Sequence, residues 1–238
     1  MDRKEAIEKR FSCRTFDPAP MSRERIGEIT ARVDRINAAS GLTLAFVEDG
    51  GAAFAGFRRS YGMFKNVRSL ILMKGPSELP DLAEKLGYYG EELILELTAL
   101  GLGTCWVGGT FDRGALSVPA VETLLLAVPV GEPGEILFKD RFLLRRLHGK
   151  RKPAKERLTA AGDVPAWLRR GMEAVVPAPS AVNSQKPQVT YADGVLTAAV
   201  PGNHPLERVD LGIAKKHFEL GAGGRFALGN GGTYARDE

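Results

Sequence analysis

The stretch "ILELTALGLG" (94–103) decides the fold, because a similar stretch, "HFELGAGGRF", recurs at 217–226. Each reads as a helix end that breaks into glycines, and the first closes a helix predicted over 80–101, with Leu93, Leu97 and Leu100 at helical spacing. A second pair, "LTLAFVEDG" (42–50) and "PQVTYADG" (187–194), predicts two strands that end in Asp-Gly. The second half of the chain therefore looks like a copy of the first. The repeat is imperfect, since the strand copies lie farther apart in sequence than the helix copies.

The other predicted elements alternate between helices and strands. Helices are predicted over 2–11, 22–37 and 164–175, with a last helix from Asp210, and strands over 42–47, 69–73, 123–131, 187–192 and 195–200. Ser22 is the expected N-cap of the second helix. Three stretches lack a regular pattern: a Gly-rich segment at 50–66, a basic segment at 145–157, and a tail expected to be loosely ordered past residue 229.

Composition places limits on the class of protein. The 238 residues are 44% hydrophobic and 26% charged, which is enough apolar content for a buried core. The net charge of +4 does not indicate nucleic acid but suits an anionic ligand. No apolar run is long enough for a membrane span, and the N-terminal residues show no secretory signal, so we expect a cytoplasmic protein without a membrane or nucleic-acid partner. Cys13 and Cys105 need no disulfide in this reading.

The motif "RFSCRTF" (10–16) carries one hydroxyl between two guanidinium groups. In an extended stretch Arg10, Ser12 and Arg14 lie on one side, and this set suits a phosphate dianion. An ordinary polar loop is the alternative.

The stretch "LGLGTCWVGGTFD" (100–112) leaves backbone uncovered at its glycines, so a flat ligand could lie against Gly108 and Gly109. The alternative is a helix C-cap followed by a tight strand, which explains Gly101 but not the later pair. The Gly-x-Gly here closes a helix, so it is not a Rossmann fingerprint.

The stretch "PAPSAVNSQKPQVTY" (177–191) is broken by prolines and rich in short polar side chains. Ser180, Asn183 and Gln185 offer a hydroxyl and two carboxamides, which pair well with sugar hydroxyls or a pyrimidine edge. A set of Asx-type turns is the alternative. Arg151, in the basic segment, adds a cation where an anion could also bind, unless that segment is simply solvated.

Other chemistry is not indicated. The three histidines lie in no metal-ligand spacing, and the cysteines form no CxxC pair. No nucleophile elbow, Walker loop or kinase signature is present, and no catalytic side chain is predicted.

Several of these motifs together resemble the FMN-dependent nitroreductase family. The resemblance rests on "AIEKRFSCRTFDPAPMSRE", "LTALGLGTCWVGGTFD" and "PAPSAVNSQKPQ", and with "KRKP" and "DLGIAKKHFEL" it spans nearly the whole chain. The order is unusual, because the Pro-Ser-Asn-Gln stretch of that family comes early and here falls at 177–187. The chain resembles the subgroup in which two half-units are fused.

The resemblance implies a single FMN site assembled from both halves. The first half would supply Arg10, Ser12, Arg14, Gly108 and Gly109, with the glycine backbone donating to the N5/O4 edge of the flavin. Arg151 would match the family's phosphate cation, and the second half would supply Ser180, Asn183 and Gln185. Lys186 separates Gln185 from Pro187, where family members have the glutamine and proline adjacent. The second half has no arginine motif for a second site.

The resemblance also implies an α+β fold, with a mixed, mainly antiparallel sheet flanked by helices and two pseudo-repeated halves at 1–150 and 151–238 forming one compact unit. The implied activity is transfer of hydride from NADH or NADPH, through the flavin N5, to a small electron-poor acceptor such as a nitroaromatic or a quinone. A flavin carrier or sensor without turnover is the alternative, and a scaffold that binds no flavin is a third. We expect a monomer able to bind flavin, with a weak dimer left open.

Overall fold

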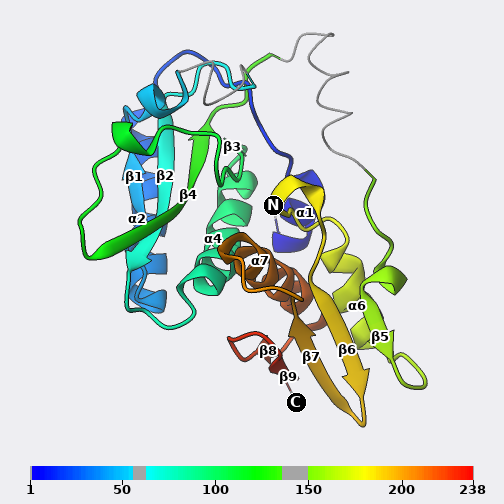
Figure 1. Cartoon of the computed structure of the whole chain (residues 1–238). Coiled ribbons are helices and arrows are strands. Elements are labelled where there is room, and N and C mark those ends of the chain that lie inside the picture. Colours follow the sequence, from blue (N-terminus) through cyan, green and yellow to red (C-terminus); the bar gives the residue numbers. More distant parts are fainter. Residues whose placement is uncertain (1, 56–62, 136–149, 238) are drawn as a thin grey trace.

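The computed structural model describes residues 2–55, 63–135 and 150–237, and it contains two β-sheets separated by a central group of helices (Figure 1). The first sheet has the order β1-β2-β4-β3 and the second the order β5-β6-β7-β9-β8. The predicted α+β class with two repeated halves is confirmed, although the strands form two sheets instead of one. Parts of the predicted 50–66 and 145–157 segments lie outside the described residues.

The first sheet is antiparallel throughout. Its strands are β1 (Ala45–Val47), β2 (Ser69–Pro76), β4 (Glu122–Gly131) and β3 (Gly103–Thr104). The first seven residues of β2 are buried, as expected for a continuous apolar strand covered on both faces. Helices α2 (Arg23–Ser40) and α4 (Leu82–Ala99) supply the apolar side chains that form the core with this sheet.

The second sheet repeats this arrangement with one added strand. The strands β6 (Gln188–Ala192), β7 (Val195–Ala199), β9 (Gly232–Ala235) and β8 (Arg225–Phe226) are antiparallel, and β5 (Leu158–Ala160) adds to β6 in parallel. Helices α6 (Ala166–Val175) and α7 (Pro205–Ala222) flank it. In each half a helix is followed by two strands, a long helix and two more strands. The two halves therefore share one topology.

Two sequence predictions about the second half are wrong. The last helix begins at Pro205, five residues before Asp210, because His204 accepts a hydrogen bond from the backbone of Leu206 and proline suits the first helical position. The tail is not loose past residue 229, because β9 pairs with both β7 and β8. The predicted cap of α2 is confirmed, since Ser22 Oγ accepts from Arg25 N at 3.2 Å.

The long helices α4 and α7 cross at two glycines. A Cβ atom at Gly87 would overlap the carbonyl oxygen of Val209, and a Cβ atom at Gly212 would overlap that of Glu84. Each glycine stands three residues after the carbonyl that the other one contacts, so the contact is reciprocal. The two halves thus meet at this crossing through equivalent positions of α4 and α7.

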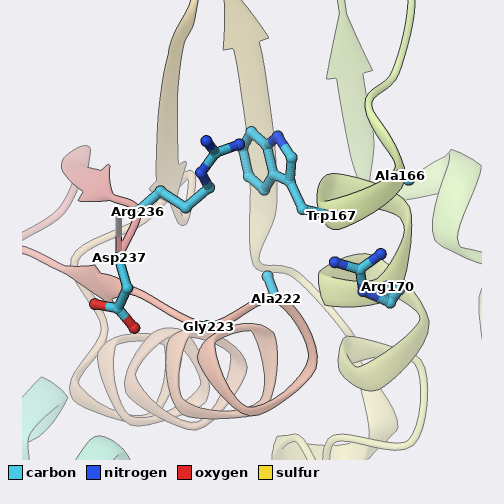
Figure 2. A pocket seen from close by; sticks show the side chains of 7 residues that line it. All are labelled: Ala166, Trp167, Arg170, Ala222, Gly223, Arg236 and Asp237. Carbon is cyan, nitrogen blue, oxygen red and sulfur yellow. The ribbon is translucent and has the colours of Figure 1, made fainter.

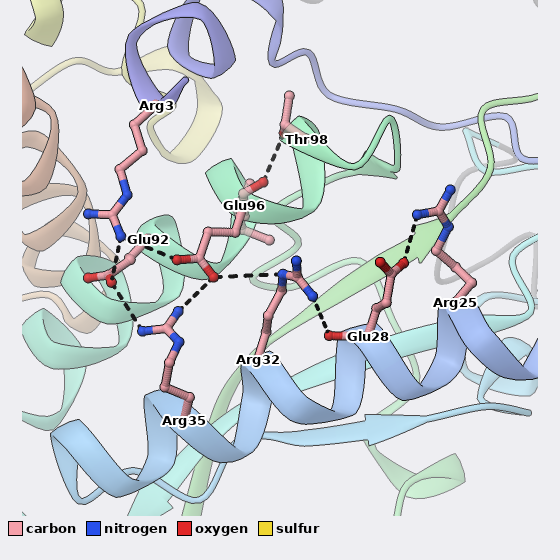
Figure 3. Close-up of polar contacts among 9 residues, drawn as sticks. Arg3, Arg25, Glu28, Arg32, Arg35, Glu92, Glu96 and Thr98 are labelled. Atoms are coloured by element: carbon pink, nitrogen blue, oxygen red, sulfur yellow. Dashed lines mark hydrogen bonds and ion pairs between the residues drawn. The ribbon is translucent and has the colours of Figure 1, made fainter. Parts of the chain in front are cut away.

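Helix α1 (Arg3–Lys9) packs against α4, and ion pairs hold both α1 and α2 there (Figure 3). Arg35 Nη2 lies 2.6 Å from Glu96 Oε2, and Arg3 Nη2 lies 3.4 Å from Glu96 Oε1. Glu92 takes part in the same cluster, and its pKa is lowered by Lys216, Arg3 and Arg35 against the effect of burial. Because α1 ends at Lys9, these ion pairs also fix the position of Arg10, the first residue of the arginine motif, relative to α4.

Short 3-10 turns complete the described chain: η1 (Gly51–Phe54), η2 (Arg113–Ala115), η3 (Ala154–Glu156) and η4 (Ala181–Asn183). No helix in the described part is both long enough and apolar enough to cross a membrane.

Candidate functional site

The arginine motif lies beside the start of the glycine turn. Ser12 forms a parallel bridge with Thr104, and Cys13 N donates to Thr104 O at 2.8 Å. Burial raises the pKa of the Cys105 thiol, while Arg14, Arg10 and a hydrogen bond from Ser12 oppose that rise. All three motif side chains therefore influence the same buried thiol.

Two nitrogen atoms of the motif are buried without a hydrogen-bond partner among the described residues. They are Arg10 Nε and Arg14 Nη1, and Arg10 as a whole is only 8% exposed. The carboxylate of Glu91 faces Arg10 Nε at 3.7 Å, which is an ion-pair distance but too long for a hydrogen bond. A buried guanidinium with unmet donors is costly unless an anion arrives to accept from it.

Arg151 is a third cation whose charge interacts with that of Arg10. Partial burial and the Arg10 guanidinium both lower the pKa of Arg151, which places the two positive groups within electrostatic reach of one another. In the described chain no carboxylate is within ion-pair distance of Arg14 or Arg151. Among the described residues, Glu91 is the one carboxylate within ion-pair distance of any of these three groups, and it also pairs with His217.

The polar loop holds the segment around Arg151 in place. Gln185 is 2% exposed, and its Oε1 accepts from Lys152 N at 2.7 Å while its Nε2 donates to Lys150 O at 3.0 Å. Asn183 Nδ2 also donates to Lys150 O, at 3.3 Å. These carboxamides, predicted as ligand contacts, thus bond the backbone on both sides of Arg151.

The loop itself is tightly constrained. Val182, Asn183 and Gln185 adopt positive φ angles of 47°, 55° and 51°, which cost energy for residues other than glycine. Ser180 Oγ accepts from Gln185 N at 2.9 Å. The buried carboxylate of Asp210, on α7, accepts from Ala181 N at 3.0 and 3.1 Å. The inserted Lys186 has a role in this packing, because it pairs with Glu207 on α7. The loop is therefore anchored to α7.

The glycine turn ends in open backbone. Gly108 packs against the side chain of Leu206 at the start of α7, and its carbonyl accepts from Arg113 Nη2 at 3.3 Å. Gly109 is exposed, and a Cβ atom there would meet nothing within 4 Å. The structure thus brings the segment of Arg10, Ser12 and Arg14 to the beginning of this turn through the Ser12–Thr104 bridge, and it fixes the backbone beside Arg151 to the polar loop. Gly108 and the polar loop both lie against the N-terminal part of α7.

Four further residues shape this region and were not predicted as site residues. Glu91 and His217 form a buried pair, Trp106 donates to Glu91, and Asp210 anchors the loop. Trp106 and the histidines were noted in the sequence without a role. The signal for Glu91 is a carboxylate inside the apolar pattern "GYYGEELILEL" of α4.

A hollow in the described residues lies elsewhere, at the C-terminal end of α7 (Figure 2). It is lined by Ala166, Trp167, Arg170, Ala222, Gly223, Arg236 and Asp237, none of them a predicted site residue. Trp167 stacks on Tyr234 with ring centroids 5.5 Å apart, and Gly224 N donates to Asp237 Oδ2 at 2.8 Å. We therefore attribute this hollow to the attachment of β9 and the residues after it. The described residues contain no group of three or more His, Cys, Asp or Glu side chains that could hold a metal ion.

Fold and site together define a single chain of two α+β halves of equal topology, with a cationic site where the end of α1 meets the turn after α4. The chain belongs to the family described as "Putative TM nitroreductase", which matches residues 2–222. A crystal structure of a protein from Thermotoga maritima, described as "a putative nitroreductase", is 25% identical, with a TM-score of 0.63 over 98% of this chain and 92% of that one. No curated protein matches the sequence.

A shorter likeness extends to an FMN-dependent nitroreductase from Clostridium difficile. It is 21% identical and covers 56% of this chain and 88% of that chain, with a TM-score of 0.46. That score is too low to support a structural conclusion.

Proposed function

We propose that the protein is an FMN-dependent oxidoreductase that takes hydride from NADH or NADPH and passes it to a small electron-poor acceptor, such as a nitroaromatic or a quinone. The observation that carries the proposal is that Arg10 Nε and Arg14 Nη1 are buried without a hydrogen-bond partner among the described residues, with only the 3.7 Å ion pair to Glu91 at Arg10 Nε. Membership of the nitroreductase family supports the reaction class.

The residues present fit a flavin mononucleotide. A phosphate dianion accepts several hydrogen bonds, and its negative charge would pair with the positive charges of Arg10, Arg14 and Arg151. The Ser12 hydroxyl stands between the two motif arginines, and the open backbone at Gly109 leaves space for a flat ring. Arg10, Ser12, Arg14 and Arg151 would hold the phosphate end, and Gly108 and Gly109 would lie along the ring.

The remaining residues would act by positioning. Gln185 and Asn183 fix the backbone on either side of Arg151, and Ser180 fixes Gln185. When bound, the flavin supplies hydride acceptance and donation. The protein would orient the cofactor and exclude water, so this proposal requires no side-chain acid or base.

The decisive experiment is a flavin titration of the purified protein. We expect FMN to bind more tightly than riboflavin, which lacks the phosphate, and Arg14→Ala to weaken FMN binding by about ten- to a hundredfold, corresponding to about 1.5–3 kcal/mol for a charge-assisted contact. Arg169→Ala, which removes an exposed arginine of α6, is the control and should bind FMN normally. Equal affinity for FMN and riboflavin, or equal losses in both variants, would contradict the phosphate assignment.

Turnover is tested separately. NADH added under anaerobic conditions should bleach the visible absorbance of the flavin-loaded protein, and the colour should return when a quinone is added. A protein that binds flavin but is not bleached by NADH or NADPH would be a carrier or sensor instead.

A further inference from the structure

The buried carboxylate of Glu91 contacts three parts of the chain at once. Its Oε2 accepts from Trp106 Nε1 at 2.9 Å, two residues before the glycine pair. Its Oε1 lies 3.7 Å from Arg10 Nε and 2.9 Å from His217 Nε2. The side chains of Glu91 and His217 are 0% exposed, so water does not compete for these contacts.

His217 connects this carboxylate to the second half. Its Nδ1 lies 2.9 Å from the carbonyl oxygen of Ala174, one of the last residues of α6. A carbonyl oxygen only accepts, so Nδ1 carries a proton. The polar loop begins three residues after Ala174, at Pro177. Glu91 therefore contacts the arginine motif directly, and it contacts the segment of the glycine turn through Trp106. Through His217 it is also connected to α6, the helix that leads into the polar loop.

The protons around Glu91 leave two arrangements. Either Nε2 donates to an ionised Glu91, which makes His217 an imidazolium, or a neutral Glu91 donates to Nε2. In either arrangement Trp106 presents a donor, and Arg10 a positive charge, to the carboxyl group of Glu91. The ionised pair and Arg10 together carry one net positive charge, the same as a neutral pair beside Arg10.

We propose that Glu91 is a positioning residue for the flavin site, which orients Arg10 toward the phosphate and fixes the glycine turn through Trp106, with His217 holding the carboxylate in place. The proposal rests on the proposed function, since it assigns Glu91 to the same site. Glu91 itself is buried behind Arg10 and Trp106, so it acts through them.

The variant Glu91→Gln removes the negative charge at residue 91 but keeps a side chain of the same shape. Glutamine keeps an oxygen to accept from Trp106, and its amide can donate to Nε2 of a neutral His217, so the hydrogen bonds and the net charge are both preserved. The ionic anchor of Arg10 alone is lost. Glu84→Gln is a matched control, because Glu84 lies two turns away on α4, is equally buried and pairs with Lys215 and Arg208 of α7, but touches no residue of the candidate site.

The experiment measures dissociation constants for FMN and riboflavin, together with urea unfolding, for the wild type and both variants. We expect Glu91→Gln to lower FMN affinity about tenfold and riboflavin affinity much less, so that the preference for FMN falls. Glu84→Gln should leave that preference unchanged even where it lowers stability. An unchanged preference in Glu91→Gln, or an equal fall in both variants, would overturn the proposal.

A second variant decides the matter should Glu91→Gln fail to fold. Trp106→Phe keeps the Glu91–His217 pair and removes the hydrogen bond to the glycine turn, so both flavins should bind several-fold more weakly than to the wild type. Wild-type affinity in Trp106→Phe would overturn the proposal. If the wild type itself binds neither flavin, the proposed function fails, which is a different result from a wild type that binds flavin and an insensitive Glu91→Gln.

Discussion

Asp210 is the buried carboxylate that anchors the polar loop, and its protonation should be visible in the stability of the protein. Burial raises the pKa of Asp210 to about 7, while the hydrogen bonds from Ala181 and Ser184 and the charge of Arg157 act in the opposite direction. Glu207 adds a further rise. The group thus binds its proton more tightly in the folded chain than in the unfolded chain.

The sign of the pH effect follows from this difference. A carboxyl group with a raised folded-state pKa stabilises the protein fully below its unfolded value of about 4, and this contribution is lost as the pH rises through about 7. We predict that the contribution of Asp210 to the free energy of unfolding falls by about 2–3 kcal/mol between pH 5 and pH 8. Urea unfolding at both pH values should show a smaller decrease in Asp210→Asn than in the wild type.

The control for this prediction is Asp163→Asn, which changes an exposed carboxylate of the same half. Its unfolding should depend on pH as the wild type does. Identical pH profiles for Asp210→Asn and the wild type would show that Asp210 is not protonated in this range.

At the scale of elements, the crossing of α4 and α7 holds the two halves together. Gly87 and Gly212 allow the two backbones to touch, which brings Tyr88 and Glu219 within a hydrogen bond of 2.5 Å and His217 within reach of Glu91. Close packing of this kind tolerates added volume poorly, because neither backbone can move without disturbing the buried ion pairs.

We predict that Gly87→Ala destabilises the protein by about 1–3 kcal/mol or more, because the new methyl group overlaps the backbone of Val209. Gly27→Ala, in α2, should instead stabilise the protein by about 0.5–1 kcal/mol, because a Cβ atom there meets nothing within 4 Å and alanine is the better helix former. Urea or thermal unfolding distinguishes the two. If Gly87→Ala were as mild as Gly27→Ala, the helices would not touch at this point.

At the scale of the whole molecule, one chain holds every part of the proposed site. The arginine motif, the glycine turn, Arg151 and the polar loop each occur once, and α4 and α7 pack within the same chain. Because the two halves are joined in one chain, their association is intramolecular, and each half is present to the other at an effective concentration on the order of millimolar.

We therefore predict that FMN binding does not depend on dimerisation. Flavin fluorescence and light scattering, followed together while the FMN-loaded protein is diluted, should show that the flavin is retained by monomers. FMN release that tracks dissociation of a dimer would contradict this prediction. A chain truncated after about residue 160 should lose FMN binding, because it lacks α7 and the polar loop.

The sequence predicted those parts of the fold that depend on local patterns. The cap at Ser22, the helix closed by Gly101 and the repeated strand ends needed only short-range chemistry. The first turn of α7 was missed because histidine is an uncommon cap, and β9 because a short Gly-rich strand is specified by its partner β7 and not by its own residues. The Glu91–His217 pair joins residues 126 positions apart, so only tertiary packing reveals it.

The reciprocal crossing of Gly87 and Gly212 has a consequence for how such a protein can change. In an assembly of two identical chains, every substitution at the axis appears twice, and both copies must be tolerated together. Here Gly87 and Gly212 are encoded separately, so a substitution in one half of the chain is not repeated in the other half. One half is thereby free to keep an arginine motif while the other keeps a loop, a division of labour that identical chains cannot reach.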